Sequence, residues 1–286
     1  MRLMRFIRID YNYLFIFILI ISCSSKMKET KIKSIESYTL NGRLEPSKAD
    51  EIFTTKLGLQ KIEIFDTDGN LIKENSFDRN MNPDNVIEYK FDSSNNLIEK
   101  MTFKNYYNQP LTKTYLSKYI YDNNLLTEIL HYYGTFDSTG FWARNKISYN
   151  EKKQKIRDEY ASYNDDAEKE TRIYDWKDEN NYIEDRINKE GILAERHFVR
   201  LDKRRKELEH RINFELASKD DYTYQVYFEK EFDEYGNETV SKNKYVGKPV
   251  QKTVYKYLYD NGNWIYRLQS TDDKNYWTEF RKIAYY

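Results

Sequence analysis

The sequence predicts an all-β fold, built either as one elongated antiparallel sheet or as a solenoid-like stack of consecutive β-hairpins. Three observations support this prediction. Aromatic residues make up 16% of the 286 residues, with 28 Tyr against 9 Gly and 4 Pro, and such side chains suit half-buried sheet surfaces. One aromatic-plus-turn phrase recurs along the chain, and the residues that flank it alternate with the period of a β-strand.

Residues 1–22 form the first element, a segment typical of export. Three arginines precede an uninterrupted apolar run at residues 13–21, and Ser22 and Cys23 follow that run. The run is well short of the roughly 20 residues that a bilayer-spanning helix needs. We therefore expect a signal peptide that is cleaved from the mature protein.

Cys23 is the one cysteine of the chain and ends the stretch Ile20-Ile21-Ser22-Cys23, which resembles the lipobox of bacterial lipoproteins. The resemblance implies that the Cys23 thiol carries a diacylglyceryl group, that cleavage occurs before it and that the new amino terminus is acylated. It implies a protein anchored in the bacterial cell envelope, at the outer membrane, with its domain outside the cytoplasm. An uncleaved anchor or a secreted protein without lipid remains the alternative.

Residues 23–36 are polar, rich in Ser and Lys and without a sustained period, so we expect a lipidated tether. We expect residues 37–286 to form one repeat domain. Because no acidic run follows Cys23, the sequence leaves open whether this domain faces the periplasm or the cell surface.

The domain carries eight copies of one phrase: an aromatic or apolar residue, then Asp or Asn, a turn-rich stretch and an apolar strand start. Successive copies begin 26, 30, 28, 25, 27, 31 and 27 residues apart. A period of about 28 residues indicates a repeated supersecondary unit. The clearest copies begin at Phe65, Phe91, Tyr121, Phe232 and Tyr259, and weaker copies begin at Tyr149, Tyr174 and Leu201.

Each copy has the chemistry of a β-hairpin. The Asp side chain can accept hydrogen bonds within its own turn, and Asn and Gly tolerate a positive φ. In one flank, Tyr255, Tyr257 and Tyr259 fall on one face of a strand and the residues between them fall on the other. Residues 200–216 would also suit a helix by composition, but their alternation and their place in the repeat favour a strand.

The phrase resembles the YD repeats of RHS-type proteins and, more closely, repetitive hypothetical lipoproteins of Bacteroidetes that end in Y-D-x-x-G-N-W. Here that ending runs from Tyr259 to Trp264, and the resemblance extends over residues 61–286. It implies a sheet architecture and no particular activity. The self-cleaving core and C-terminal toxin of the RHS family have no match in this chain, and eight units are too few for the large shell that those proteins build.

Charge and cysteine content exclude several functions. The chain has 47 basic and 47 acidic residues, and removal of residues 1–22 leaves 44 basic and 46 acidic. No electrostatic excess is available to attract nucleic acid. A single cysteine can form neither an internal disulfide nor a cysteine metal cluster.

No pattern selects a catalytic or metal site, and we expect no cofactor. The stretch Asp66–Asn70 invites a calcium interpretation, but an EF-hand alignment places unsuitable residues at both end positions, which favours a simple turn. The three histidines, His131, His197 and His210, lie far apart in sequence and form no metal motif. A zinc or nucleophilic site assembled in space stays open, because sequence distance does not forbid it.

Aromatic side chains exposed on a sheet can stack on sugars or pack on peptides. The candidates are Trp142, Trp176, Trp264 and Trp277, and packing between repeats is the alternative role for them. We therefore expect a membrane-anchored, non-catalytic binding or scaffold module, not an enzyme, with an unknown glycan or protein ligand. The alternatives are an envelope enzyme acting on polysaccharide, and an immunity or assembly factor that pairs strands with another envelope protein.

Overall fold

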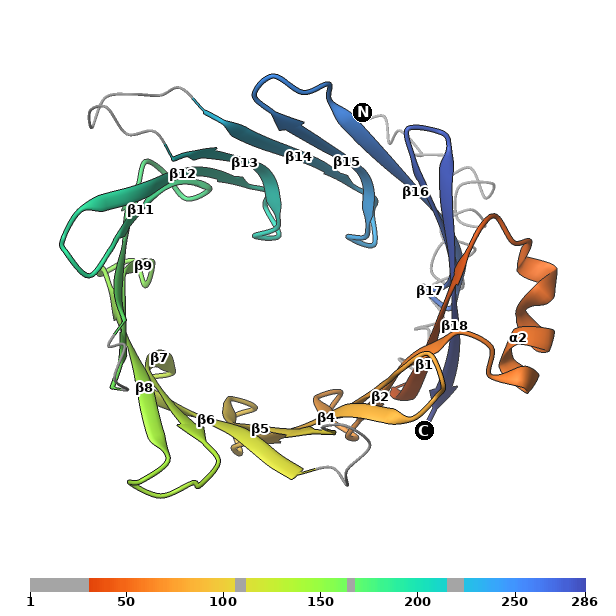
Figure 1. Cartoon of the computed structure of the whole chain (residues 1–286), viewed down its shortest axis with the longest axis horizontal. Coiled ribbons are helices and arrows are strands. Elements are labelled where there is room, and N and C mark those ends of the chain that lie inside the picture. The colour runs from red at the N-terminus through yellow and green to blue at the C-terminus, as the bar shows by residue number, and fades with distance from the viewer. Residues whose placement is uncertain (1–30, 106–111, 164–167, 215–223) are drawn as a thin grey trace, which may run out of the picture.

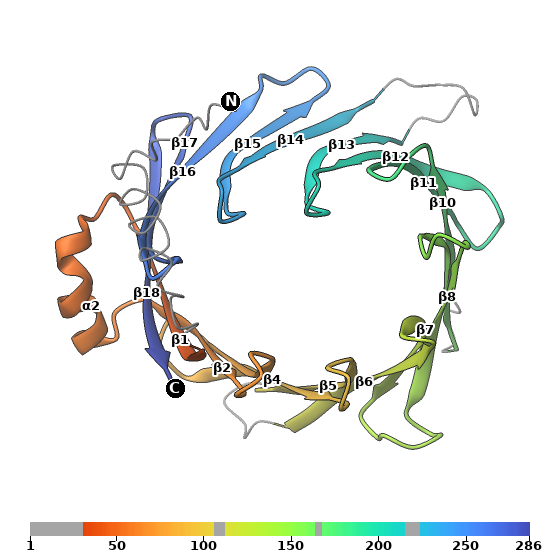
Figure 2. The ribbon, with the colours of Figure 1, turned by 180° about the vertical axis from the view of Figure 1, so that it is seen from behind.

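The computed structural model describes residues 31–105, 112–163, 168–214 and 224–286. In these residues a single antiparallel sheet of 18 strands closes into a ring-shaped barrel, shown in Figure 1 and from behind in Figure 2. The elements are β1 (Ile32–Asn41), η1 (Pro46–Lys48), α2 (Ala49–Thr55), β2 (Leu59–Phe65), β3 (Leu71–Phe77), β4 (Pro83–Phe91), β5 (Leu97–Lys104), β6 (Thr112–Asp122), β7 (Leu125–Tyr133), β8 (Phe141–Tyr149), β9 (Lys155–Ser162), β10 (Lys169–Trp176), β11 (Asn181–Ile187), β12 (Leu193–Leu201), β13 (Glu207–Asn213), β14 (Val226–Phe232), β15 (Glu238–Tyr245), β16 (Gln251–Asp260), β17 (Asn263–Thr271) and β18 (Asn275–Tyr285).

The first and last strands close the barrel. β1 pairs with β18 from Ile32 opposite Tyr285 to Asn41 opposite Trp277, and it pairs with β2 on its other side. Every described strand therefore has two neighbours, which leaves no row of unpaired backbone groups at a sheet edge.

The prediction of an all-β, antiparallel fold is confirmed, but the sheet is a closed barrel and not the predicted elongated sheet or solenoid-like stack. Nothing in the local pattern specifies closure. It results from strand twist summed over all the hairpins and from pairing between β1 and β18, which lie outside the repeated phrase.

Each copy of the phrase forms one hairpin turn, at or near the ends of β2, β4, β6, β8, β10, β12, β14 and β16. In the first turn, Asp66 Oδ1 accepts hydrogen bonds from the backbone N–H groups of Asp68 and Asn70, both at 2.9 Å. Gly69 provides the positive φ of 89° that this turn requires. The turn interpretation of Asp66–Asn70 is thus confirmed.

A β-bulge accompanies seven of the eight hairpins. The register shifts by one residue at the aromatic or apolar residue of the phrase, for example between Ile64 and Phe65 and between Leu258 and Tyr259. A bulge bends the strand and increases its local twist. The bulges at these seven hairpins therefore add to the curvature of the sheet.

Two segments refine the expected boundaries. Residues 207–213 form β13, paired with β12, so the strand prediction for residues 200–216 is confirmed over its central part. β1 begins at Ile32, so residues 32–36, expected in the tether, belong to the barrel instead. The reason is that Ile35 is buried in the wall, where its apolar side chain loses contact with water.

A short helical segment that the pattern does not predict lies outside the ring. Pro46 suits the first position of η1, and Asp50 and Glu51 suit the positive end of α2. Lys56, in the left-handed region at φ 57°, ends the helix. Ile52 of α2 packs in a small hydrophobic core with six partly buried or buried barrel side chains: Tyr38, Leu59, Ile62, Tyr266, Leu268 and Phe280.

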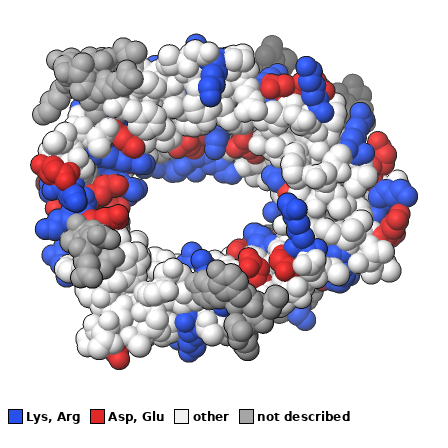
Figure 3. Space-filling view, viewed as in Figure 1, with Lys and Arg blue, Asp and Glu red and all other residues white. Residues whose placement is uncertain are grey.

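The position of α2 identifies the two faces of the wall. Because α2 lies outside the ring in Figure 1, the side chains under it, Tyr38 and Phe280 among them, point outward. Successive residues along a strand point to opposite faces of the wall, and register partners on adjacent strands point to the same face. The strand register therefore shows which residues of every strand point into the lumen. Figure 3 shows a lumen that is open through the described part of the barrel.

Candidate functional site

The outer wall carries cross-strand ion pairs in the middle of strands around the barrel. The pairs, with their N to O distances, are Lys73 with Glu88 (3.0 Å), Arg144 with Glu128 (3.0 Å), Arg196 with Asp185 (2.7 Å), Arg200 with Glu209 (3.0 Å) and Lys242 with Glu229 (3.2 Å). Paired charges of this density are typical of a sheet face that contacts water.

The inner wall carries aromatic side chains whose polar atoms connect adjacent hairpins. Tyr121 donates its hydroxyl hydrogen bond to the carbonyl of Leu97 at 3.0 Å, and Tyr149 donates to that of Leu126 at 2.9 Å. Each acceptor lies at the start of the second strand of the preceding hairpin. Burial raises the pKa of both phenols, which keeps them protonated as donors. These two bonds give the hydroxyl groups of Tyr121 and Tyr149 a role that Phe at the equivalent position of other copies does not fill.

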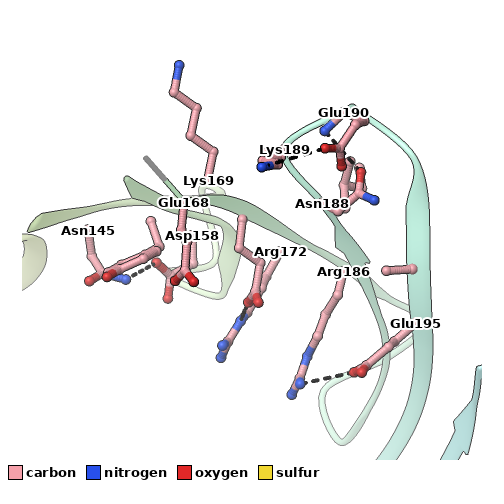
Figure 4. Close-up of a pocket in the computed structure, with 14 residues that line it drawn as sticks. Asn145, Asp158, Glu168, Lys169, Arg172, Arg186, Asn188, Lys189, Glu190 and Glu195 are labelled. Carbon is pink, nitrogen blue, oxygen red and sulfur yellow. Dashed lines mark hydrogen bonds and ion pairs between the residues drawn. The ribbon is translucent and has the colours of Figure 1, made fainter. Parts of the chain in front are cut away.

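A hollow of about 690 Å³ opens on the inner wall where β8 to β12 meet, and Figure 4 shows the side chains around it. Arg172 and Arg186 are register partners and extend side by side. Like charges directly opposite each other are unfavourable, and here carboxylates offset them. Glu170 pairs with Arg172, and Arg186 contacts Glu184 at 2.7 Å and Glu195 at 3.1 Å.

The hollow is also lined by Tyr160, Asn145 and Asp158. The amide of Asn145 donates to Asp158 at 2.9 Å, so both are held in fixed orientations. The hollow thus combines one aromatic ring with ordered donors and acceptors of both charge signs. Such a surface matches a polar, uncharged or zwitterionic ligand better than a strongly charged one.

A second polar cluster continues along the inner wall from this hollow. His197 Nδ1 lies 2.7 Å from His210 Nε2, and His197 Nε2 lies 2.9 Å from Glu195. Glu207 lies 3.4 Å from the other nitrogen of His210. Burial lowers the pKa of His197, and the hydrogen bond with His210 lowers the pKa of Glu207.

The four tryptophans proposed for ligand stacking lie in different surroundings. Trp277 is 46% exposed, whereas Trp264 is 7% exposed and is covered by Arg281 at 3.5 Å from its ring centre. Trp142 and Trp176 are half-buried, and Trp176 donates to the carbonyl of Lys155 at 2.8 Å. The structure does not bring the four rings together, and Cys23 lies outside the described residues.

The spacing of residues in the sequence contains a signal for these clusters, although no linear motif does. A repeat of about 28 residues folded as a hairpin places residues about 14 apart side by side on adjacent strands. His197 and His210 are 13 apart and meet, although they seem distant in the sequence. His131 lies 14 residues after Ser117 and 14 before Asn145, and it contacts both.

No group of three or more His, Cys, Asp or Glu side chains in the described part of the chain has the arrangement of a metal site. Among the same residues, no helix has both the length and the apolar character needed to cross a membrane.

Comparisons with known proteins identify no family. No family model matches the chain, and no curated protein matches it significantly. Among solved structures, a porin-like protein from Bacteroides uniformis is similar at 11% identity, with a TM-score of 0.37, over 89% of this chain and 99% of that one. A chain of the TcdB2-TccC3-TEV structure is similar at 10% identity, with a TM-score of 0.24, over 84% of this chain and 16% of that one.

Proposed function

We propose that this protein is a lipid-anchored binding module of the bacterial cell envelope, and that its ligand is a glycan held against the inner wall of the barrel. The observation that carries the proposal is the hollow beside Arg172 and Arg186. Its ring and its ordered arginine, amide and carboxylate groups suit a ligand with many hydroxyl groups.

The outer wall supports attachment by lipid rather than by insertion of the strands. A barrel that spans a bilayer presents an apolar band about 25 Å tall, and one Lys or Arg facing lipid at its midplane costs about 2–4 kcal/mol. Here charged pairs such as Lys73 with Glu88 and Lys242 with Glu229 lie on that face in mid-strand. We infer that the barrel stays in water and that acyl chains on Cys23 hold it at the membrane, at about 0.8 kcal/mol per buried methylene.

The alternatives differ in what they need from the barrel. Strand pairing with a partner would need an uncovered sheet edge, whereas every described strand has two paired neighbours. An enzyme would need a nucleophile or an acid and base pair in the lumen.

Glycan binding is tested on a glycan array, followed by calorimetry with the best ligand. Arg172→Ala removes an inner arginine, and Arg157→Ala is the matched control on the outer face of the adjacent strand. We expect Arg172→Ala to weaken binding about tenfold or more, because it leaves polar groups of the hollow unpaired, and Arg157→Ala to leave it unchanged. Equal effects of the two variants, or binding of peptides and of no glycan, would contradict the proposal.

A further inference from the structure

Four polar side chains on four consecutive strands form one hydrogen-bonded chain on the inner wall. Ser117 Oγ of β6 lies 3.0 Å from His131 Nδ1 of β7, and His131 Nε2 lies 3.0 Å from Asn145 Oδ1 of β8. Asn145 Nδ2 lies 2.9 Å from Asp158 Oδ1 of β9. Ser117 and His131 are direct register partners, so their contact is fixed by the sheet itself.

In this series of hydrogen bonds, the donor and the acceptor of each bond can be assigned. The Asp158 carboxylate only accepts hydrogen bonds, so Asn145 must turn its N–H₂ group toward Asp158 and its carbonyl toward His131. That carbonyl accepts from His131 Nε2–H, which leaves Nδ1 as the acceptor in the neutral ring. The Ser117 hydroxyl then donates to Nδ1. Lys155, 3.3 Å from the other oxygen of Asp158, fixes the far end.

From this arrangement we propose that Ser117 is a nucleophile and His131 its general base in the hydrolysis of small acyl esters. A hydroxyl that donates to a neutral imidazole, with a third group orienting the ring, is the combination that activates serine. Asn145 and Asp158 are positioning residues, because they act through His131.

Lys100 places a positive charge on the strand adjacent to this nucleophile. It is the register partner of Ser117 on β5 and shares the inner face with it. Its ammonium lies 6.0 Å from the ring centre of Tyr89, and no ion pair in the described residues occupies it. From this adjacent strand its charge favours the oxyanion that forms when Ser117 attacks a carbonyl.

The reaction needs water and no other reagent. Ser117 Oγ forms a bond to the ester carbonyl carbon as its proton passes to His131 Nδ1. The tetrahedral intermediate collapses with cleavage of the bond to the alcohol oxygen, which takes that proton and leaves as the free alcohol. Water then attacks the acyl-serine, gives a proton to His131, and returns the Ser117 hydroxyl and a carboxylic acid.

Ser117 is partly exposed on the inner wall, and we propose the short acetyl group as the acyl part of the substrate. The substrate class is then acetyl esters of sugar hydroxyl groups, and the choice of a sugar as the alcohol rests on the proposed glycan binding. The ester chemistry itself stands independently of it.

The test uses a fluorophosphonate, which reacts with activated serines, and p-nitrophenyl acetate as a minimal ester. We expect labelling at Ser117, located by peptide mass spectrometry, and its loss in Ser117→Ala. We expect His131→Gln to slow both labelling and ester hydrolysis about 100-fold or more. Ser148→Ala is the matched control, since Ser148 lies on the outer face of β8.

Asn145→Asp separates a positioning role from a purely structural one. A carboxylate at this position favours the protonated form of His131, so the acid limb of the pH-rate profile should move to higher pH. Lys100→Met should slow hydrolysis and leave the profile in place. Absence of label at Ser117 in the folded wild type, or equal hydrolysis by Ser117→Ala, overturns the proposal. Neither result affects glycan binding at Arg172, which is measured separately.

Discussion

Tyr38 of β1 and Phe280 of β18 are register partners at the seam of the barrel, and they are 0% and 1% exposed. They lie under α2, where Ile52 packs on both strands. The largest fully buried side chains of the described protein thus include the pair that joins the first strand to the last. The short helix outside the ring stabilises the seam by covering it.

We expect Phe280→Ala to lower the free energy of unfolding by about 3–5 kcal/mol, because it leaves a cavity in this core. Urea titration followed by circular dichroism gives the value. Phe214→Ala is the control, since Phe214 is 48% exposed, and it should cost less than about 1 kcal/mol. Similar losses in the two variants would show that the seam is not specially stabilised.

Substitutions at equivalent positions of two turns should change the free energy of unfolding in opposite directions. Lys153 and Gly69 both occupy the fourth position of the turn with positive φ, at 59° and 89°. Lys153→Gly should raise the free energy of unfolding by about 0.5–1 kcal/mol, because it removes the cost of a left-handed lysine. Gly69→Ala should lower it by about 1 kcal/mol. Changes of the same sign in thermal and urea melts would contradict the turn assignment.

The turn aspartates predict a loss of stability in acid. Backbone N–H groups of Asn82 and Asn96 lower the pKa of Asp78 and Asp92 respectively. A carboxyl group whose pKa is lower in the folded state contributes stability above its unfolded pKa, about 3.9, and loses it as the pH falls through the folded value.

We therefore expect the free energy of unfolding to fall as the pH drops below about 4, and Asp92→Asn to reduce this fall. Asp84→Asn is the control, because Asp84 lies in β4 rather than at a turn. If Asp92→Asn leaves the pH dependence unchanged, the capping interaction is not responsible for it.

The hydroxyl groups between hairpins should each stabilise the barrel modestly. Tyr149→Phe removes the bond to the Leu126 carbonyl and should cost about 1 kcal/mol. Tyr133→Phe, at a ring that is 54% exposed, should cost nothing measurable. If Tyr149→Phe leaves the free energy of unfolding unchanged, the ring of Tyr149 contributes by packing and its hydroxyl group does not stabilise the barrel.

Local chemistry in the sequence predicts the hairpins but not the barrel. The phrase around Asp66 contains both the acceptor and the glycine that its turn requires, so the turn follows from five residues. Closure depends on the pairing of β1 with β18, more than 200 residues apart in the chain. The helix at Ala49–Thr55 is only seven residues long and is stabilised mainly by its packing on the seam.

The candidate sites depend in the same way on which strands become neighbours. Ser117, His131, Asn145 and Asp158 match no linear motif, but their separations of 14, 14 and 13 residues are close to half of the repeat of about 28. Once the hairpins are known, this spacing places the four side chains on adjacent strands. To decide whether each side chain points into or out of the barrel, the position of α2 must be known as well.

Attachment by lipid and not by the barrel wall is tested most directly by fractionating cells that make the full-length protein or residues 24–286 exported behind a cleavable signal peptide without a lipobox. Membranes are washed with high salt and alkaline carbonate and then extracted with detergent. We predict that the wild type is released only by detergent, whereas residues 24–286 are recovered, folded, in the aqueous fraction. If residues 24–286 still require detergent, the barrel wall itself enters the membrane, and the lipid-anchored account is contradicted.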